Sequence, residues 1–180
     1  MTSTRPPSPL LRELLKASQM ARGPLFAPRL SAAGLPVLGV PLWGIDVVSA
    51  GTQFYQPDEA GTLAAIVAAY HGRSMVDLVA CSFTTRETRT RKGVAVVLGE
   101  EWIEDARFGS RPLRIFDDVF TWLNGSCRGV VVIDWQEAPH HLRDISQIHC
   151  ESAVTADRLI RAFERPTPYP RVLVCNGDRP

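Results

Sequence analysis

The first part of the chain carries hydrophobic positions at helical spacing. Four leucines and one serine fall on a single helical stripe: Leu10, Leu11, Leu14, Leu15 and Ser18. Ser8 and Pro9 have the residue types of an N-cap and a first helical position, so the pattern predicts a helix from Pro9 to Arg22. Residues 23–36 are rich in proline and glycine and predict a connector. The pattern leaves open whether this helix packs on its own domain or on a partner.

A second helical pattern follows at residues 56–72. Pro57 and the two acidic residues after it suit the first turn of a helix, and Gly72 suits its end. Between them, apolar residues recur at helical spacing: Leu63, Ile66, Val67 and Tyr70. The sequence therefore predicts a helix between Gln56 and Gly72.

Elsewhere, short runs dense in apolar residues predict strands. These runs are Val37–Val40, Trp43–Val48, Met75–Cys81, Val94–Leu98, Leu113–Phe116, Gly129–Asp134, Ile145–Cys150 and Arg171–Cys175. Spacing and capping residues predict further helices at Glu100–Arg107, at Asp117–Leu123 and from Ser152 to about Arg165. Gly129–Asp134 shows no alternation of apolar and polar positions, which is typical of a central parallel strand covered on both faces. The polar residues 82–93 predict a hairpin tip or an extended loop.

The order of these elements predicts an α/β fold. We expect a single compact domain with a central, mostly parallel or mixed sheet, helices on its faces and the N-terminal helix appended. A chain of 180 residues is long enough for one good core and short for two domains. Residues 1–35 then form the N-terminal helix and its connector, and residues 36–180 form the α/β domain.

Composition narrows the function classes only a little. The formal net charge is +1, so the chain as a whole is not drawn towards nucleic acid or membrane surfaces. No apolar stretch approaches the ~20 residues of a membrane span, so no membrane contact is expected. The four cysteines form no CxxC pair, which favours reduced thiols and a cytoplasmic location. The phosphate-loop, dinucleotide, nucleophile-elbow and HExxH motifs are missing, and no cofactor is predicted.

The densest basic segment is the loop from Arg86 to Lys92, with Arg89 and Arg91 between them. Arginines beside hydroxyl side chains can hold phosphates, so this loop is the candidate for a nucleic-acid or phosphate contact. The alternative is a solvated hairpin tip, because only Phe83 lies close enough in sequence to stack on a base. The partner itself is unknown, and a protein partner also remains open.

Asp134 is the first candidate for chemistry, because it ends a buried strand where α/β sheets often bind ligands. Its carboxylate could bind a metal or act as a general base, with Glu100 or Glu101 as further carboxylates. Alternatively, Asp134 caps a turn or pairs with an arginine. His140 is a second weak candidate for a metal ligand, but its neighbour His141 points elsewhere on either a helix or a strand. A structural or surface role is favoured for these histidines, and no metal site is predicted.

Two resemblances bear on function. The segments DLVAC (77–81) and PLRIFDDVFTWLNGSCRGVVVIDW (112–135) resemble small uncharacterised proteins encoded by bacterial phages and integrated mobile elements near replication genes. That resemblance extends to Cys175 and implies no known activity.

The layout of VAVVLGEEWIED (94–105) and GVVVIDWQE (129–137) is similar to Toprim domains. That family catalyses phosphoryl transfer with a Glu after one strand and a DxD motif after a later one. Here Leu98 stands at the Glu position, so Glu100 would have to substitute, and the DxD motif is reduced to Asp134, Trp135 and Gln136. This second resemblance implies a degenerate, non-catalytic relative.

The residues therefore favour a non-catalytic binding or accessory protein associated with nucleic-acid processing in a phage or mobile element. Its contacts would be the Arg86–Lys92 loop and the N-terminal helix. The alternative is a metal-dependent phosphoryl-transfer enzyme, with Asp134 and Glu100 or Glu101 as metal ligands. The binding protein is preferred because the sequence supplies no complete catalytic set.

Overall fold

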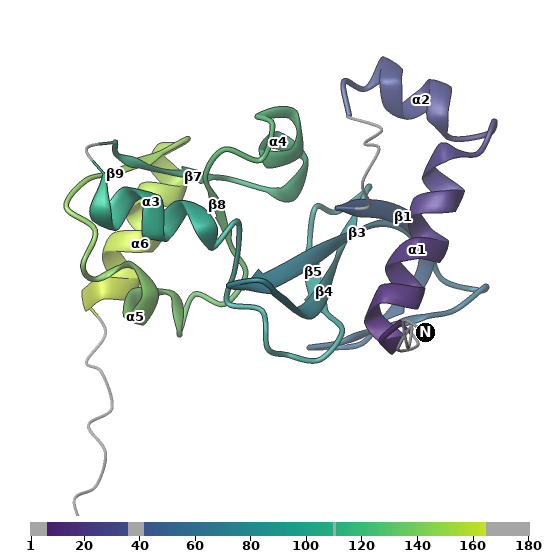
Figure 1. Cartoon of the computed structure of the whole chain (residues 1–180), viewed down its shortest axis with the longest axis horizontal. Helices are drawn as coiled ribbons and strands as arrows, with labels where there is room; N and C mark the ends of the chain where they lie inside the picture. Colours follow the sequence, from purple (N-terminus) through teal and green to yellow (C-terminus); the bar gives the residue numbers. More distant parts are fainter. Residues whose placement is uncertain (1–6, 36–41, 110, 165–180) are drawn as a thin grey trace, which may run out of the picture.

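A computed structural model of the protein describes residues 7–35, 42–109 and 111–164. Its helices are α1 (Pro9–Arg22), α2 (Ala27–Ala32), α3 (Glu101–Phe108), α4 (Val119–Asn124), α5 (Ala138–Leu142) and α6 (Ala153–Glu164). Its strands are β1 (Trp43–Ala50), β2 (Tyr55–Pro57), β3 (Thr62–His71), β4 (Ser74–Ser82), β5 (Thr88–Thr90), β6 (Val97–Leu98), β7 (Leu113–Phe116), β8 (Val130–Val132) and β9 (Ile148–Cys150). Figure 1 shows that the strands form two sheets in different halves of the molecule.

The first sheet, sheet A, has the strand order β2-β1-β3-β4-β5, and every neighbouring pair is antiparallel. A backbone bridge joins Phe54, just before β2, to Thr90 of β5, so the two edges of the sheet meet. Sheet A is therefore curled rather than open.

The second sheet, sheet B, has the order β6-β8-β7-β9 and is mixed. Strands β8 and β9 run parallel to β7, whereas β6 runs antiparallel to β8. The expectation of one central, mostly parallel or mixed sheet is wrong, because the described strands form two sheets, the larger is antiparallel, and the parallel pairs are confined to the smaller one. The physical reason is connectivity: parallel neighbours need a long crossover, and the strands of sheet A follow one another with no helix between them.

The predicted helix between Gln56 and Gly72 is also wrong, since this segment forms β2 and β3. Six consecutive residues of β3, from Ala64 to Ala69, are buried. An apolar run covered on both faces satisfies the spacing of a helical stripe as well as that of a buried strand. Pairing with β1 on one side and β4 on the other decides the outcome in favour of the strand.

Other helices and strands agree with those predicted from the sequence. The helix Pro9–Arg22 is confirmed, and Ser8 Oγ accepts a hydrogen bond from the Leu11 N–H at 3.2 Å, as an N-cap does. The strand Leu113–Phe116 is confirmed at both ends. Helices α2 and α5 are short and were not expected. The predicted strands Val37–Val40 and Arg171–Cys175 lie outside the described residues.

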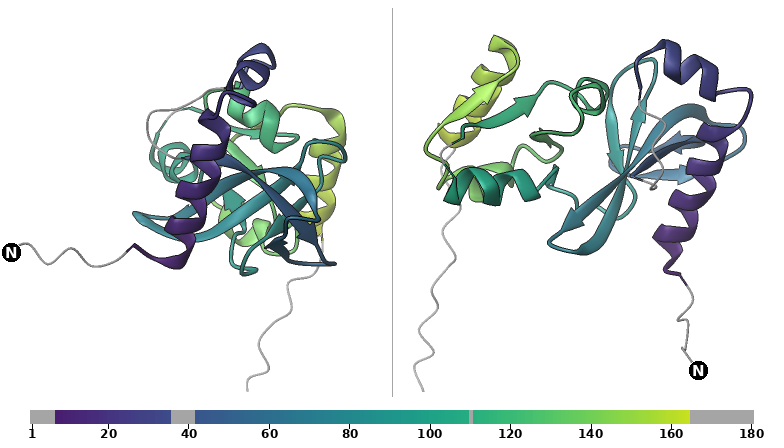
Figure 2. Two further views of the ribbon diagram at one scale, coloured as in Figure 1. Left: turned by 90° about the vertical axis from the view of Figure 1, so that its right-hand side faces the viewer. Right: turned by 45° about the horizontal axis from the view of Figure 1, so that its top comes forward.

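Helix α1 packs directly on one face of sheet A, as Figure 2 shows from two sides. Its buried Leu10, Leu14 and Ala17 meet small and branched side chains of β3 and β4. The backbones of α1 and β1 lie close together, because a Cβ on Gly44 of β1 would lie 2.2 Å from the carbonyl carbon of Ala17. The N-terminal helix therefore packs on its own domain.

The opposite face of sheet A carries the core that joins the two halves. There Ile45, Val67 and Val79 pack in one cluster with Trp122 of α4 and Phe116 of β7. Within the part of the chain that the structure describes, no helix has both the length and the apolar character needed to cross a membrane.

A buried carboxylate fixes the passage from sheet A to sheet B. Asp77 of β4 is fully buried, and its two oxygens accept five backbone N–H bonds of 2.8–3.1 Å. One donor is the neighbouring Leu78, and the others are Arg91, Lys92, Val94 and Ala95. Because these donors satisfy the carboxylate, the segment 91–95 that leads from β5 to β6 is held against β4.

We expect Asp77→Asn to lower the free energy of unfolding by about 3 kcal/mol or more, because the amide nitrogen would face two N–H donors and lose two charge-assisted hydrogen bonds. Urea unfolding followed by tryptophan fluorescence measures this loss. Asp58→Asn is the matched control, since the side chain of the exposed Asp58 accepts one backbone N–H among the described residues, that of Ala60. Equal losses in the two variants would contradict a special role for Asp77.

Candidate functional site

A cleft of about 910 Å³ opens between the edge of sheet A and the elements beside sheet B. Three parts of the chain form its walls: the segment before β2 together with β5, the loop that follows β8, and one side of α6. The lining residues are Thr52, Gln53, Phe54, Thr88, Arg89, Thr90, Gly93, Ala95, Ile133, Asp134, Trp135, Gln136, Val154, Asp157, Arg158, Arg161 and Ala162. The cleft thus exists only because the two halves of the molecule are packed together.

Aromatic side chains stand on both walls of the cleft. Phe54 is 46% exposed, and its ring lies over Gly93, where a Cβ would come within 2.7 Å of the ring. Across the cleft, the guanidinium carbon of Arg158 lies 4.3 Å from the ring centroid of Trp135. The Trp135 ring is thereby stacked under a cation, while the Phe54 ring faces solvent.

Charged side chains of both signs line the same space. Arg89, Arg158 and Arg161 contribute three positive charges, and Asp134 and Asp157 contribute two negative ones. The lining therefore carries a small net positive charge. Arg161 is exposed on α6, which leaves its guanidinium accessible from the cleft.

The structure separates the basic residues of the Arg86–Lys92 loop. Arg86 stacks on Phe120 at 4.1 Å from the ring centroid, on the side of the shared core. Arg89 reaches the cleft, where its Nε donates to the Gly51 carbonyl at 3.1 Å. Lys92 is exposed and does not line the cleft. The loop therefore presents no single patch of four cations.

Arg91 belongs to a different group, which ties α1 to sheet A. Its Nε donates to Glu13 Oε2 at 3.1 Å, and the hydroxyl of Tyr55 donates to Glu13 Oε1 at 2.8 Å. Burial raises the pKa of Tyr55 far above its usual range, and the neighbouring Glu13 carboxylate raises it further. The Tyr55 hydroxyl therefore stays protonated and acts as a fixed donor to Glu13.

The candidate carboxylates take separate partners. Asp134 lies in the cleft, where its Oδ1 accepts the N–H groups of Gln136 and Glu137 at 2.8 and 3.3 Å. This is the turn-capping arrangement that was the alternative to metal binding. Glu100 instead meets Nδ1 of His71, at 2.9 Å from Oε1.

The remaining metal candidates lie outside the cleft. Nδ1 of His141 is 3.9 Å from Glu100 Oε1, so two histidines lie near this carboxylate. Glu101 is exposed in the first turn of α3, and His140 is exposed on α5. Among residues 7–35, 42–109 and 111–164, no group of three or more His, Cys, Asp or Glu side chains could hold a metal ion.

The described cysteines are poorly suited to act as nucleophiles. Burial raises the pKa of Cys81 to about 12, with the Asp118 charge adding to the effect. Burial likewise raises the pKa of Cys127 to about 11, helped by the charge of Glu101, and it raises the pKa of Cys150. Because the thiolate is the reactive form, these thiols are held in their unreactive state near neutral pH.

Sequence reasoning missed most of the residues that shape the cleft. Phe54, Trp135 and Arg161 carry no motif, and they come from three distant segments. One signal was available: Asp157, Arg158 and Arg161 share the polar side of the amphipathic helix that was predicted from Ser152. Comparisons with protein-family models, curated proteins and solved structures give no match, so the site must be argued from its own geometry.

We expect iodoacetamide to label Cys127 at least about ten-fold more slowly in the folded protein than in urea at neutral pH. The raised pKa cuts the thiolate fraction about 100-fold, and the greater nucleophilicity of a more basic thiolate recovers only part of this. Peptide mass spectrometry separates Cys127 from the other cysteines. Equal labelling rates in the two states would contradict the raised pKa, because the thiol would then be as accessible and as readily ionised in the folded protein as in urea.

Proposed function

We propose that the protein is a non-catalytic binding protein that holds a short single-stranded nucleic acid segment in this cleft. The observation that carries the proposal is the combination of the exposed Phe54 ring, the Arg158–Trp135 stack and the accessible Arg161 around one opening. Single-stranded nucleic acids are bound by aromatic faces that stack on bases and by cations that follow the backbone. Both kinds of group face the same space here.

The size and shape of the cleft favour a single strand over a duplex. Its volume of about 910 Å³ lies within the range of pockets that enclose small ligands, so it can take a few unstacked nucleotides. The Phe54 ring is set into one wall, where only a base that has left its helical stack can reach it. A duplex offers phosphates to the rim but no free base faces.

The charge balance of the cleft predicts a modest electrostatic contribution to the affinity. Three arginines against two aspartates leave the lining only slightly positive, and the whole chain carries a formal charge of +1. Stacking must then contribute a large share of the binding free energy, with the arginines setting register and salt dependence.

The enzymatic alternative finds less support in the same geometry. A metal shared by Asp134 and Glu100 would need both carboxylates at one point, whereas Asp134 accepts N–H groups of its own turn and Glu100 meets His71. An accessory role in nucleic-acid processing of a phage or mobile element is part of the proposal and comes from the sequence resemblance alone.

Fluorescence anisotropy with a labelled single strand of about 12 nucleotides and a duplex of equal length tests the proposal. We expect the single strand to bind more tightly than the duplex. Phe54→Ala should weaken single-strand binding about five-fold or more, since stacking on one base contributes about 1 kcal/mol or more. Arg161→Gln should lower the slope of log K against log salt by about 0.7, the value for one phosphate contact on a single strand.

Matched controls make the result specific. Phe108→Ala removes a phenylalanine that is 84% exposed on α3, and Arg73→Gln removes an exposed arginine from the β3–β4 turn; neither residue lines the cleft. Both controls should bind as the wild type does. The proposal is wrong if no single strand binds, if the duplex binds equally well, or if controls and cleft variants lose affinity alike.

A further inference from the structure

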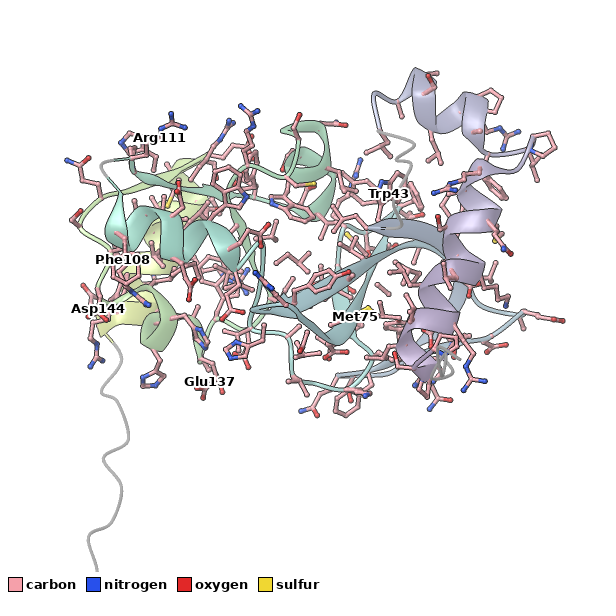
Figure 3. All side chains as sticks on the ribbon, in the orientation of Figure 1. Trp43, Met75, Phe108, Arg111, Glu137 and Asp144 are labelled. Carbon is pink, nitrogen blue, oxygen red and sulfur yellow. The ribbon has the colours of Figure 1, made fainter. Side chains whose placement is uncertain are left out.

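A second, smaller pocket of about 360 Å³ lies at the amino ends of β7 and β8. Arg111 and Pro112 precede β7, and Arg128 and Gly129 precede β8. Helix α3 closes the other side with Trp102, Asp105 and Ala106. Figure 3 shows Arg111 at the surface of the half built on sheet B. This is the end of β8 opposite to Asp134, so the pocket is separate from the cleft.

Three arginines line this pocket: Arg111, Arg114 and Arg128. Gly129 lies close against β7, because a Cβ on Gly129 would lie 2.5 Å from the Arg114 carbonyl oxygen. Gly129 also has a φ of +135°, which strains any other residue. The position that follows Arg128 therefore requires a glycine for β8 to lie against β7.

Charge compensation inside the pocket is incomplete. Asp105 is the single acidic residue among its lining residues. Arg114 lies 3.6 Å from Glu151 and stacks on Phe116 at 4.4 Å, which fixes its position. Within the described ranges, neither Arg111 nor Arg128 forms an ion pair with a carboxylate. Like charges that line one pocket favour an anion between them.

The chemistry of the lining identifies the class of anion. Guanidinium groups bind phosphate through paired N–H donors, and three of them suit the dianion of a phosphate monoester. Trp102 is half-buried in the wall and offers an aromatic face next to these cations. The volume, at the lower end of the range for ligand pockets, suits a molecule of mononucleotide size.

We propose that this pocket binds a small phosphate monoester with a planar ring, of the nucleoside monophosphate class, with the phosphate between the arginines and the ring against Trp102. This site does not depend on the cleft or on its proposed function. It adds a second ligand to the protein, a free phosphate monoester in place of the phosphodiesters of a strand.

Isothermal titration of the full chain with adenosine monophosphate tests this site. We expect the double variant Arg111→Gln, Arg128→Gln to bind at least about ten-fold more weakly, because two of the three charged donors are gone. Both arginines are exposed, so the variant should fold, and its thermal midpoint without ligand should not fall. The matched control is Arg29→Gln, Arg73→Gln, which removes two exposed arginines from other surfaces and should bind normally.

Two further ligands test the phosphate and the ring separately, and one variant of the cleft tests whether the two sites bind independently. Adenosine, which lacks the phosphate, should bind at least about ten-fold more weakly than the monophosphate, and ribose 5-phosphate about five-fold more weakly. Arg161→Gln in the cleft should leave binding of the monophosphate unchanged. The proposal fails if the monophosphate does not bind, if the Arg111 and Arg128 variant binds it normally, or if either probe matches its affinity.

Discussion

The carboxylate of Asp77 is the constraint on which the arrangement of the two sheets depends. A charge without contact to water is tolerated inside sheet A because five backbone N–H groups surround its two oxygens. Four of those donors belong to the segment that leads from β5 to β6. The buried charge therefore fixes the direction in which the chain leaves one sheet and enters the other.

The cleft follows from that connection. Gly93 and Ala95, within the segment that Asp77 holds, form part of its floor, and Phe54 packs over Gly93. The arginines of the neighbouring loop serve different purposes: Arg91 ties α1 to sheet A through Glu13, while Arg89 faces the cleft. One basic run in the sequence thus has two structural roles, a tie between α1 and sheet A at Arg91 and part of the cleft wall at Arg89.

The two proposed sites occupy opposite ends of β8 and bind their ligands through different interactions. The cleft beyond its carboxyl end combines aromatic faces with dispersed charges, which suits a chain that is bound mainly by stacking. The pocket at its amino end is small and is lined by three arginines, which suits one compact anion. Gly129 allows β8 to lie against β7 beside the second site, because a side chain there would collide with the Arg114 carbonyl oxygen.

The sequence by itself determined the elements whose signals are local. Helix α1, with Ser8 as its cap, and strand β7 lie where capping and apolar spacing place them. Tertiary structure decided the rest. The run Ala64–Ala69 fits a helix or a doubly covered strand until β1 and β4 pair with it, and strand direction depends on which strands become neighbours. Asp77 looks like an ordinary polar strand residue until segment 91–95 supplies its donors, and both sites arise only from contacts between distant segments.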